Sequence, residues 1–312
     1  PTRRLLVCAI RCSLTPMIAR KYLYLIALAR ERHFGKAAAA CHVSPSTLST
    51  GIRDLEQELG VVLVERGQQF AGFTPEGECV VAHAKRAVAD AEDLRQALDV
   101  MRGGLSGQLR IGVIPTALAV ISALTAPFAR SHPRVNIEVR SASTQAILAQ
   151  LRSFELEAGI LYVESGSAGD LHCLPIWEED LAFLTRSGGP LAGRDEIEWR
   201  DAARQPLCLL SRDMQNRQTI DRVFGELGCA PQISLETNSI LSILAHVRAG
   251  PWGSILPRSV LELIGAPSGF HALRLVGPAV KWHTGLVTLA REPRSTMIAA
   301  LFEQAGALVK SF

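Results

Sequence analysis

The stretch FGKAAAACHVSPSTLSTGIRDLEQELGVVLVER, from Phe34 to Arg66, decides the fold of the first part of this chain. Its first seven residues are rich in alanine and predict a short helix, and residues 42–45 predict a tight turn. A second helix follows from Ser46 to Leu59. Two helices joined by a short turn are typical of a helix-turn-helix, whose second helix enters the major groove of DNA.

The second helix divides into a buried and an exposed side. Four leucine and isoleucine side chains recur at i, i+4, i+7 and i+11 and predict one buried stripe: Leu48, Ile52, Leu55 and Leu59. The opposite side, at about 100° per residue, carries Ser46, Thr50 and Arg53. Hydroxyl groups and a guanidinium in this position can bind base edges in the major groove. An ordinary capped helix pair of an all-α domain has the same local pattern, so the pattern alone leaves both readings open.

The start of the second helix has its own local chemistry. Ser44 suits the N-cap, where its hydroxyl accepts a hydrogen bond from a free amide, and Pro45 suits the first helical position because it lacks an N–H. The remaining free amides at this end can meet a DNA phosphate. The candidate DNA-contacting residues are therefore Lys36, Ser44, Pro45, Ser46, Thr47, Thr50, Arg53 and Arg66.

A longer pattern indicates a family. Residues 37–66 read AAxxxxVSxSxLSxxIxxLExELGVxLVxR, and residues 73–77 read FTPEG. This pattern resembles the winged helix-turn-helix of LysR-type transcriptional regulators, and the resemblance extends from about Met17 to the C-terminus. Three features depart from the family pattern: Pro45, Gly51 and the wing at residues 67–70, which is poor in basic residues. Gly51 should cost the helix roughly 1 kcal/mol relative to alanine.

Composition agrees with this reading without deciding it. A chain of 312 residues is long enough for two or three domains, and 48% of it is hydrophobic, so large cores can form. The net charge is only +3, and residues 17–75 contain seven Lys or Arg against five Asp or Glu. Binding to DNA should therefore depend on few phosphate contacts per chain, with a modest dependence on salt that dimerisation would double.

The ends of the chain bear on its location. No apolar run approaches the ~18 residues of a membrane span. Residues 1–16 place Arg3 and Arg4 before a six-residue apolar run, which Arg11 interrupts, so a secretory signal is not predicted. We expect residues 1–16 to be an N-terminal extension upstream of the family's usual start at Met17. We expect the protein to be cytoplasmic and not to bind a membrane.

Seven cysteines lie at positions 8, 12, 41, 79, 173, 208 and 229. They form no CxxC pair and no Cys/His cluster with the spacing of zinc ligands, so neither a metal nor a cofactor is predicted. Scattered cysteines in a reducing compartment are mostly small buried apolar side chains. A thiol-based, redox-responsive regulator of the same fold, sensing through Cys173, Cys208 or Cys229, is the alternative.

Residues 76–101 predict a long helix that links two domains. Its apolar residues alternate spacings of four and three, which is a heptad seam: Val80, Ala84, Ala87, Ala91, Leu94, Leu98 and Met101. A helix with a narrow apolar stripe needs a partner, and the simplest partner is a second copy of itself. Packing of the early positions against the chain's own wing domain is the alternative. Residues 103–107, GGLSG, end the helix and form a hinge.

From residue 108 onward, strands and helices alternate. Strands are expected at 108–114, 135–139 and 158–163, with helices at 117–130 and 144–154, which predicts a mainly parallel sheet with right-handed crossovers. A second unit spans 181–275, with helices at 216–227 and 240–249, and the chain returns at 285–290 before a last helix at 295–309. The chain is thus predicted to be an α+β multidomain protein: a winged helix-turn-helix domain (17–75), a dimerisation linker helix and hinge (76–107), and a periplasmic-binding-protein-like α/β effector domain of two subdomains (108–312).

Ligands of such sheets bind beyond the carboxyl ends of the strands, opposite helix N-termini. Positions that meet this rule are the candidate effector-binding residues, with Thr116 and Ser143 closest to the positions that the family resemblance implies: Thr116, Ala117, Ser143, Thr144, Tyr162, Asn238 and Ser239. Residues 214–216 are expected near the rim of the same cleft. Hydroxyl groups and free helix N-termini favour a small anion such as a carboxylate. N-capping is the alternative role of each serine and threonine.

Catalytic motifs are missing from the sequence. It contains no GxSxG, no P-loop, no GxGxxG after a strand and no HExxH, so we do not expect an enzyme. A solute-binding protein is disfavoured because no export signal precedes the clamp. The family resemblance implies a regulator that acts as a homodimer or homotetramer and has three kinds of partner: double-stranded promoter DNA, a small-molecule effector and RNA polymerase.

Overall fold

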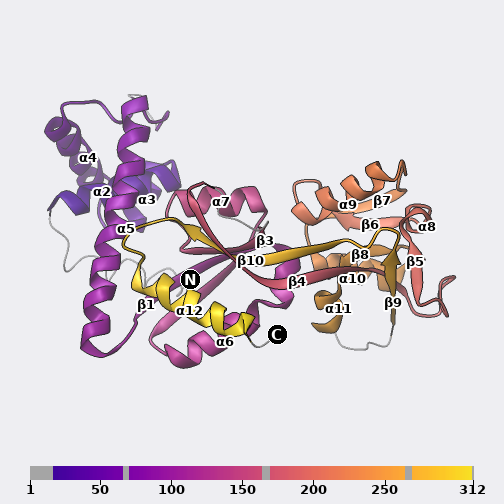
Figure 1. The fold of residues 1–312 in the computed structure, drawn as a ribbon. Coiled ribbons are helices and arrows are strands. Elements are labelled where there is room, and N and C mark those ends of the chain that lie inside the picture. The colour runs from indigo at the N-terminus through magenta and orange to yellow at the C-terminus, as the bar shows by residue number, and fades with distance from the viewer. Residues whose placement is uncertain (1–16, 66–69, 164–168, 264–268, 311–312) are drawn as a thin grey trace. The chain divides into compact units, whose positions relative to one another are not determined.

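The computed structural model describes residues 17–65, 70–163, 169–263 and 269–310. The expected extension at 1–16, the candidate Arg66 and most of the wing lie outside these residues. The chain forms two compact units that divide between Leu98 and Asp99. The first holds the helix-turn-helix, and the second holds all the strands of the α/β sheets (Figure 1).

Three helices and the start of a fourth build the first unit. They are α2 (Met17–Glu31), α3 (Phe34–Ala40), α4 (Pro45–Leu59) and α5 (Pro75–Gly103). Side chains from all four share one apolar core, which includes Leu25, Leu48, Leu55 and Val81. Past α4, an isolated antiparallel bridge pairs Val64 with Phe73 and forms the base of the wing.

The ends of α4 are fixed by the residues that the sequence singled out. The Ser44 hydroxyl accepts a hydrogen bond from the Thr47 amide at 3.1 Å, and Pro45 is the first helical residue. At the other end Gly60 has a φ of 69°, which closes the helix in the left-handed conformation that glycine adopts readily. The Glu56 carboxylate accepts from the Leu63 and Val64 amides at 2.8 and 3.2 Å and so directs the chain from α4 into the wing.

The buried stripe of α4 is one turn shorter than predicted. Leu48, Ile52 and Leu55 are buried, whereas Leu59 is 43% exposed. Leu59 is the last helical residue, and the turn at Gly60 leaves its side chain in contact with water. The prediction that Leu59 belongs to the buried stripe was wrong.

Helix α5 changes its environment along its length. Its start is held by Thr74, whose hydroxyl accepts from the Gly77 amide at 2.9 Å and donates to the Val62 carbonyl at 2.7 Å. Val81 and Ala84 are buried near this end. Further along, the seam becomes exposed, with Leu94 at 64%, Leu98 at 45% and Met101 at 83%.

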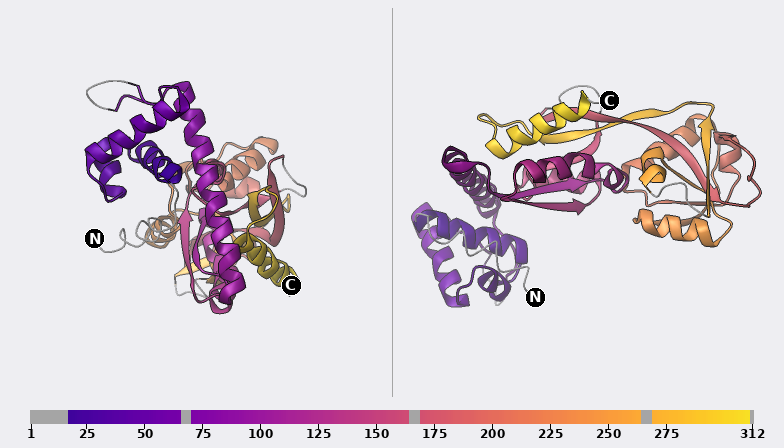
Figure 2. Two further views of the ribbon diagram at one scale, coloured as in Figure 1. Left: turned by 90° about the vertical axis from the view of Figure 1, so that its left-hand side faces the viewer. Right: turned by 90° about the horizontal axis from the view of Figure 1, so that it is seen from below.

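The second unit consists of two subdomains joined by two long antiparallel strands, β4 (Leu171–Arg186) and β10 (Lys281–Leu289). Figures 1 and 2 show these strands running from the subdomain of β1, β2 and β3 to that of α8 to α11. The main sheet has the order β2-β1-β3-β10-β4-β9-β5, β8 pairs with β4, and β6 and β7 form a separate two-stranded sheet.

The first subdomain follows the predicted βαβαβ order. Strand β1 (Gly107–Val113) pairs in parallel with both β2 (Val135–Ser141) and β3 (Ala158–Val163). The connecting elements are η2 (Pro115–Ala119), α6 (Ile121–Ser131) and α7 (Thr144–Arg152), and α12 (Thr296–Val309) packs against the same core. The helix expected at 117–130 is therefore in two pieces, because Pro115 starts a 3-10 helix and the α-helix begins only after Val120.

The second subdomain is less regular than the sequence suggested. Its elements are β5 (Glu196–Glu198), α8 (Trp199–Ala203), β6 (Leu207–Leu210), α9 (Gln215–Glu226), β7 (Ile233–Thr237), α10 (Ile240–Ala249), β8 (Ser254–Pro257), α11 (Arg258–Leu263) and β9 (Phe270–Val276). Strands β6 and β7 are parallel, as are β5 and β9, but β8 and β9 run antiparallel to β4. The sequence did not predict that β4 extends over sixteen residues and crosses both subdomains.

Candidate functional site

The face of α4 that should meet DNA is open to solvent. Ser46, Thr47, Thr50 and Arg53 are all exposed, whereas Leu48 and Leu55 on the other side are buried. At the start of the helix, the Ser44 Oγ lies 2.8 Å from both the Ser46 Oγ and the Thr47 Oγ1. The structure thus presents hydroxyl groups and one guanidinium together on one side of α4.

Two further features, Lys36 on α3 and Gly51 on the buried side of α4, bear on this face. Lys36 is exposed on α3, whose N-cap is the His33 side chain: its Nδ1 accepts from the Gly35 and Lys36 amides at 3.0 and 3.3 Å. Gly51 lies on the buried side of α4, and a Cβ there would come within 2.7 Å of the Tyr24 ring. The glycine that departs from the family pattern therefore allows α2 to pack closely against α4.

Four of the candidate effector residues line one pocket in the second unit. The first subdomain contributes Ile114, Pro115, Thr116, Ser143, Thr144 and Tyr162. The second subdomain contributes Leu210, Met214, Gln215 and Asn216. We call this the effector pocket. Its free volume is about 10 Å³, which is room for one water molecule at most. In this state the two subdomains close the pocket.

The other three candidates are placed elsewhere. Ala117 is buried in the core of the first subdomain. Asn238 and Ser239 do not line the effector pocket, and Ser239 caps α10 by accepting from the Ser242 amide at 3.4 Å. The register of β6 with β7 pairs Thr237 with Leu210, and the Ser211 amide donates to the Thr237 carbonyl at 2.9 Å. The pocket is formed instead by the end of β6 and the start of α9.

A hydrogen bond between Thr116 and Tyr162 closes one side of the pocket. Their hydroxyl oxygens are 2.7 Å apart. Burial raises the pKa of Tyr162 above its ordinary value, so the phenol stays protonated, and its ring lies edge-on to Trp282 with centroids 5.9 Å apart. Ser143 caps α7 by accepting from the Ala146 amide at 3.4 Å. Ser143 therefore has the capping role that we considered as its alternative.

Polar atoms in the pocket lack partners. Asn216 is only 2% exposed, and among the described residues neither its amide oxygen nor its amide nitrogen makes a hydrogen bond of ordinary geometry. The Thr144 hydroxyl is also buried without a hydrogen bond in the described part of the chain. Buried polar side chains are nearly always hydrogen-bonded. Asn216 lies in the first turn of α9, whose N-cap residue Met214 offers no side-chain cap, so free amides of the helix end add to these groups.

Arg217 holds this end of α9 in place, and the sequence analysis missed it. Its guanidinium is fully buried and donates to the Leu210 carbonyl at 3.0 Å. It also pairs with Asp221 at 2.8 Å and with Glu236 at 3.2 Å. These contacts join α9 to the ends of β6 and β7. The sequence shows only the pairing with Asp221, four residues further along α9, because Leu210 and Glu236 belong to other elements.

Comparison with known proteins agrees with both units. The profile described as "Bacterial regulatory helix-turn-helix protein, lysR family" matches residues 19–78, and the "LysR substrate binding domain" profile matches residues 102–309. The chain belongs to the LysR family. It is therefore a LysR-type DNA-binding transcriptional regulator, and the fold class expected from the sequence is confirmed.

Several relatives of this LysR-family chain are regulators of the peroxide response. It is 31% identical over 235 residues to a hydrogen peroxide-inducible genes activator of Pectobacterium carotovorum subsp. carotovorum, covering 75% of this chain and 78% of that protein. It is 29% identical over 281 residues to the transcriptional dual regulator OxyR of Escherichia coli, covering 90% and 92%. A full-length OxyR variant from Pseudomonas aeruginosa has a similar structure, with a TM-score of 0.74, 27% identity and coverage of 94% and 95%.

The full-length LysR-family regulator CbnR in complex with its target DNA has the same fold. The TM-score is 0.66 at 22% identity, over 94% of this chain and all of that chain. In the described part of this LysR-family chain, no helix is both long and apolar enough to cross a membrane, and no group of three metal-ligating side chains is found.

The cysteines of this LysR-family chain can be compared with the expectation for thiol sensing. In the described part of the chain, Cys41, Cys79, Cys173, Cys208 and Cys229 form no disulfide. Cys208 is fully buried, and burial raises the pKa of its thiol to about 11. Cys229 is partly buried, with its sulfur 3.7 Å from the Leu227 carbonyl oxygen. A reactive cysteine needs an accessible thiolate. The Cys208 thiol is neither accessible to solvent nor ionised at neutral pH.

Proposed function

We propose that this regulator controls promoter binding through a small carboxylate-like anion held in the effector pocket. The observation that carries this proposal is the set of incompletely bonded polar groups there: the Asn216 amide, which interacts with the Tyr162 hydroxyl but makes no hydrogen bond of ordinary geometry, the Thr144 hydroxyl, and the start of α9, which no side chain caps. Backbone amides at helix starts favour negative charge. No lysine or arginine lines the pocket among the described residues, which fits a monoanion better than a phosphate ester.

The closed pocket implies how the ligand acts. Because about 10 Å³ cannot hold a carboxylic acid, binding requires the two subdomains to separate or to reset across β4 and β10. The ligand then shifts the population of subdomain arrangements by its difference in affinity for them. We infer that this change resets paired DNA-binding domains in a dimer or tetramer and alters DNA bending and contact with RNA polymerase, in the cytoplasm.

The proposal keeps the domain division drawn from the sequence. Residues 17–75 read DNA, residues 76–107 dimerise, and residues 108–312 bind the effector. The candidate base and phosphate contacts stay as predicted, namely Lys36, Ser44, Pro45, Ser46, Thr47, Thr50, Arg53 and Arg66. Thr116, Ser143, Thr144 and Tyr162 stay as effector contacts, and Asn216, which the sequence analysis expected near the rim of the cleft, is added as a contact. Ala117, Asn238 and Ser239 are no longer proposed.

Two sets of variants test the proposal. Operator DNA is first selected from a random pool by the wild-type protein. We expect Thr50→Ala or Arg53→Ala to weaken specific binding by roughly 1–3 kcal/mol if each side chain reads a base edge. Thr116→Val and Asn216→Leu should leave operator affinity intact. The same two variants should abolish binding of formate, acetate or propionate, measured by calorimetry against the matched uncharged amides.

The control for the pocket variants is Thr125→Val. Thr125 lies on α6 and its hydroxyl donates to its own helix at the Ile121 carbonyl, away from the pocket. It should bind the carboxylates as the wild type does. Equal operator affinity of wild type, Thr50→Ala and Arg53→Ala would show that the wrong face of α4 was chosen. Loss of operator binding in Thr116→Val would make that residue structural.

A peroxide-responsive regulator is the second candidate, because the relatives that share 29–31% identity carry that name. The burial and raised pKa of Cys208 argue against sensing at that thiol. We expect hydrogen peroxide to leave operator binding unchanged, and mass spectrometry to find Cys208 oxidised more slowly than the exposed Cys79. A peroxide-dependent change in binding that disappears in Cys173→Ser, Cys208→Ser or Cys229→Ser would establish thiol sensing instead.

A further inference from the structure

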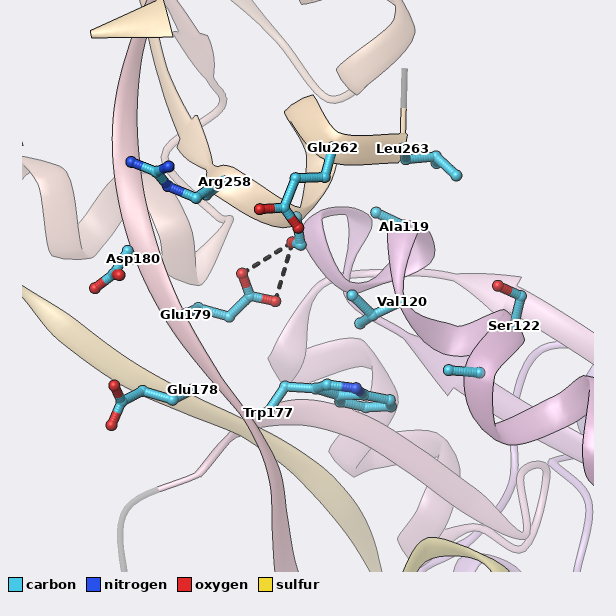
Figure 3. Close-up of a pocket in the computed structure, with 12 residues that line it drawn as sticks. Ala119, Val120, Ser122, Trp177, Glu178, Glu179, Asp180, Arg258, Glu262 and Leu263 are labelled. Atoms are coloured by element: carbon cyan, nitrogen blue, oxygen red, sulfur yellow. Dashed lines mark hydrogen bonds between the residues drawn. The ribbon is translucent and has the colours of Figure 1, made fainter. Parts of the chain in front are cut away.

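A second cavity lies at the hinge between the two subdomains and is not part of the effector pocket. Its volume is about 390 Å³. Three segments surround it: residues 119–123 from the η2–α6 turn, residues 177–180 of β4, and residues 258–263 of α11. Figure 3 shows Trp177 and Glu179 projecting from β4 and Glu262 projecting from α11. Helix α11 also contacts η2, so this helix links the second subdomain to the first.

Glu179 is the buried charge of this hinge cavity. Its side chain is 4% exposed, and the Ser259 hydroxyl donates to its two carboxylate oxygens at 2.8 and 3.1 Å (Figure 3). An ionised carboxylate has about four acceptor sites, and one hydroxyl satisfies little of that capacity. A buried charge that lacks a cationic partner is costly. The free energy of the closed hinge therefore depends on whether Glu179 is protonated.

The groups that face Glu179 come from every neighbouring element. Helix α11 contributes Ser259 and Glu262, and β4 contributes Asp180 together with Glu178, which lines the cavity and pairs with Lys281 of β10. On β10, Trp282 is the direct partner of Glu179 in the sheet. Tyr162 of β3 is close enough that the charge of Glu179 raises the pKa of its phenol. The η2–α6 turn contributes no ionisable side chain to the cavity, and Arg258, which also lines it, is exposed. Burial, with smaller contributions from Glu262 and Asp180, raises the pKa of Glu179 to about 7 against the opposing effect of the Ser259 hydrogen bond.

We propose that Glu179, Ser259 and Glu262 form a proton-controlled latch between β4 and α11. With Glu179 neutral, α11 packs against β4 and keeps the carboxyl group itself buried. When Glu179 releases its proton to solvent, its charge repels Glu262, water reaches the carboxylate, and α11 loosens from β4 and η2. Because α11 contacts η2, the latch sets how firmly the two subdomains hold each other. This device depends on neither the effector nor DNA.

The sign of the pH dependence follows from linkage. The closed hinge binds the Glu179 proton more tightly than an open, hydrated hinge, in which the carboxyl returns toward its ordinary pKa of 4.5. Closure is therefore favoured fully at pH values below 4.5. It loses free energy as the pH rises toward about 7 and has lost the whole contribution above that value. Each pKa unit between the two states corresponds to about a tenfold change in the opening equilibrium.

Amide hydrogen exchange at two pH values tests the latch in the full-length protein. Glu179→Gln keeps the shape and stays neutral at every pH. At pH 8 we expect the amides of α11 and η2 to exchange at least tenfold faster in the wild type than in Glu179→Gln. At pH 5, only slightly above the ordinary pKa of 4.5, the difference should shrink to a few-fold. The control is Glu226→Gln, at the exposed end of α9, which should match the wild type at both pH values.

Two further variants separate electrostatics from packing. Glu262→Gln removes a charge that repels ionised Glu179, so α11 should loosen less at pH 8 than in the wild type. Ser259→Ala removes the donor that stabilises the ionised carboxylate, so α11 should loosen more at pH 8 than in the wild type. Equal exchange in the wild type and Glu179→Gln at pH 8 would overturn the latch. So would a difference of the same size at pH 5, or shifts of Glu262→Gln and Ser259→Ala in the same direction.

Discussion

Gly51 shows how one residue serves the tertiary structure against its local preference. Within a helix, glycine is less favourable than alanine because it loses more backbone entropy. In α4, however, the position faces Tyr24 of α2, and a Cβ would lie 2.7 and 2.9 Å from two ring carbons. Real Cβ atoms do not come that close to aromatic carbons. The sequence pattern registered only the local cost, because the ring that requires the glycine lies 27 positions earlier.

We predict that Gly51→Ala destabilises the first unit although it improves helix propensity. The propensity gain of about 1 kcal/mol is opposed by overpacking, which typically costs about 1–3 kcal/mol. The matched control is Gly306→Ala in α12, where a Cβ meets no atom within 4 Å, so only the gain should appear. Thermal unfolding shows whether the melting temperature of each variant rises or falls. A rise in melting temperature for Gly51→Ala would show that Tyr24 moves aside easily.

Among the elements, those set by local periodicity were predictable. Helices α3, α4 and α5 and strands β1 to β3 lie within a few residues of the expected ranges, because their apolar spacing depends only on neighbouring residues. The same holds for Thr116, Ser143 and Thr144, which follow strand ends, and for Tyr162, which lies near the end of β3. The length of β4, the roles of Asn216 and Arg217, and the place of Ser239 depend on pairings between distant segments, such as β6 with β7, and the local pattern does not contain them.

Helix α5 gives the second prediction, since its apolar seam lies exposed in a single chain. Replacing both Leu94 and Leu98 with glutamate should dissociate the dimer, because each leucine buried at a helix seam contributes about 1.5–3 kcal/mol and introduced like charges repel across it. The control is Val100→Glu, which is exposed on the same helix but lies off the seam. Sedimentation over a dilution series measures the effect. A dimer that persists in the double variant would place the interface elsewhere.

At the scale of the whole molecule, promoter binding depends on pairing two DNA-binding domains. A single chain has only a small excess of positive charge in residues 17–75, so we expect one DNA-binding domain alone to bind DNA weakly. Joining two DNA-binding domains raises the overall affinity by about 10²–10⁴-fold when both half-sites are bound together. The geometry of the dimer therefore decides whether a promoter is recognised, and a ligand that resets this geometry controls the gene.

The last prediction follows from that geometry and concerns the spacing of the operator. Half-sites should lie about 34–36 Å apart, one helical turn of 10–10.5 base pairs, or a multiple of that distance. Inserting five base pairs between them turns one half-site to the opposite side of the duplex and should remove roughly 10²-fold or more of the affinity. Inserting ten base pairs should restore part of it. In the same gel-shift titration, the affinity of the Leu94→Glu and Leu98→Glu double variant should not depend on the spacing. If the five-base-pair insertion leaves the affinity of the wild-type protein unchanged, each DNA-binding domain binds independently.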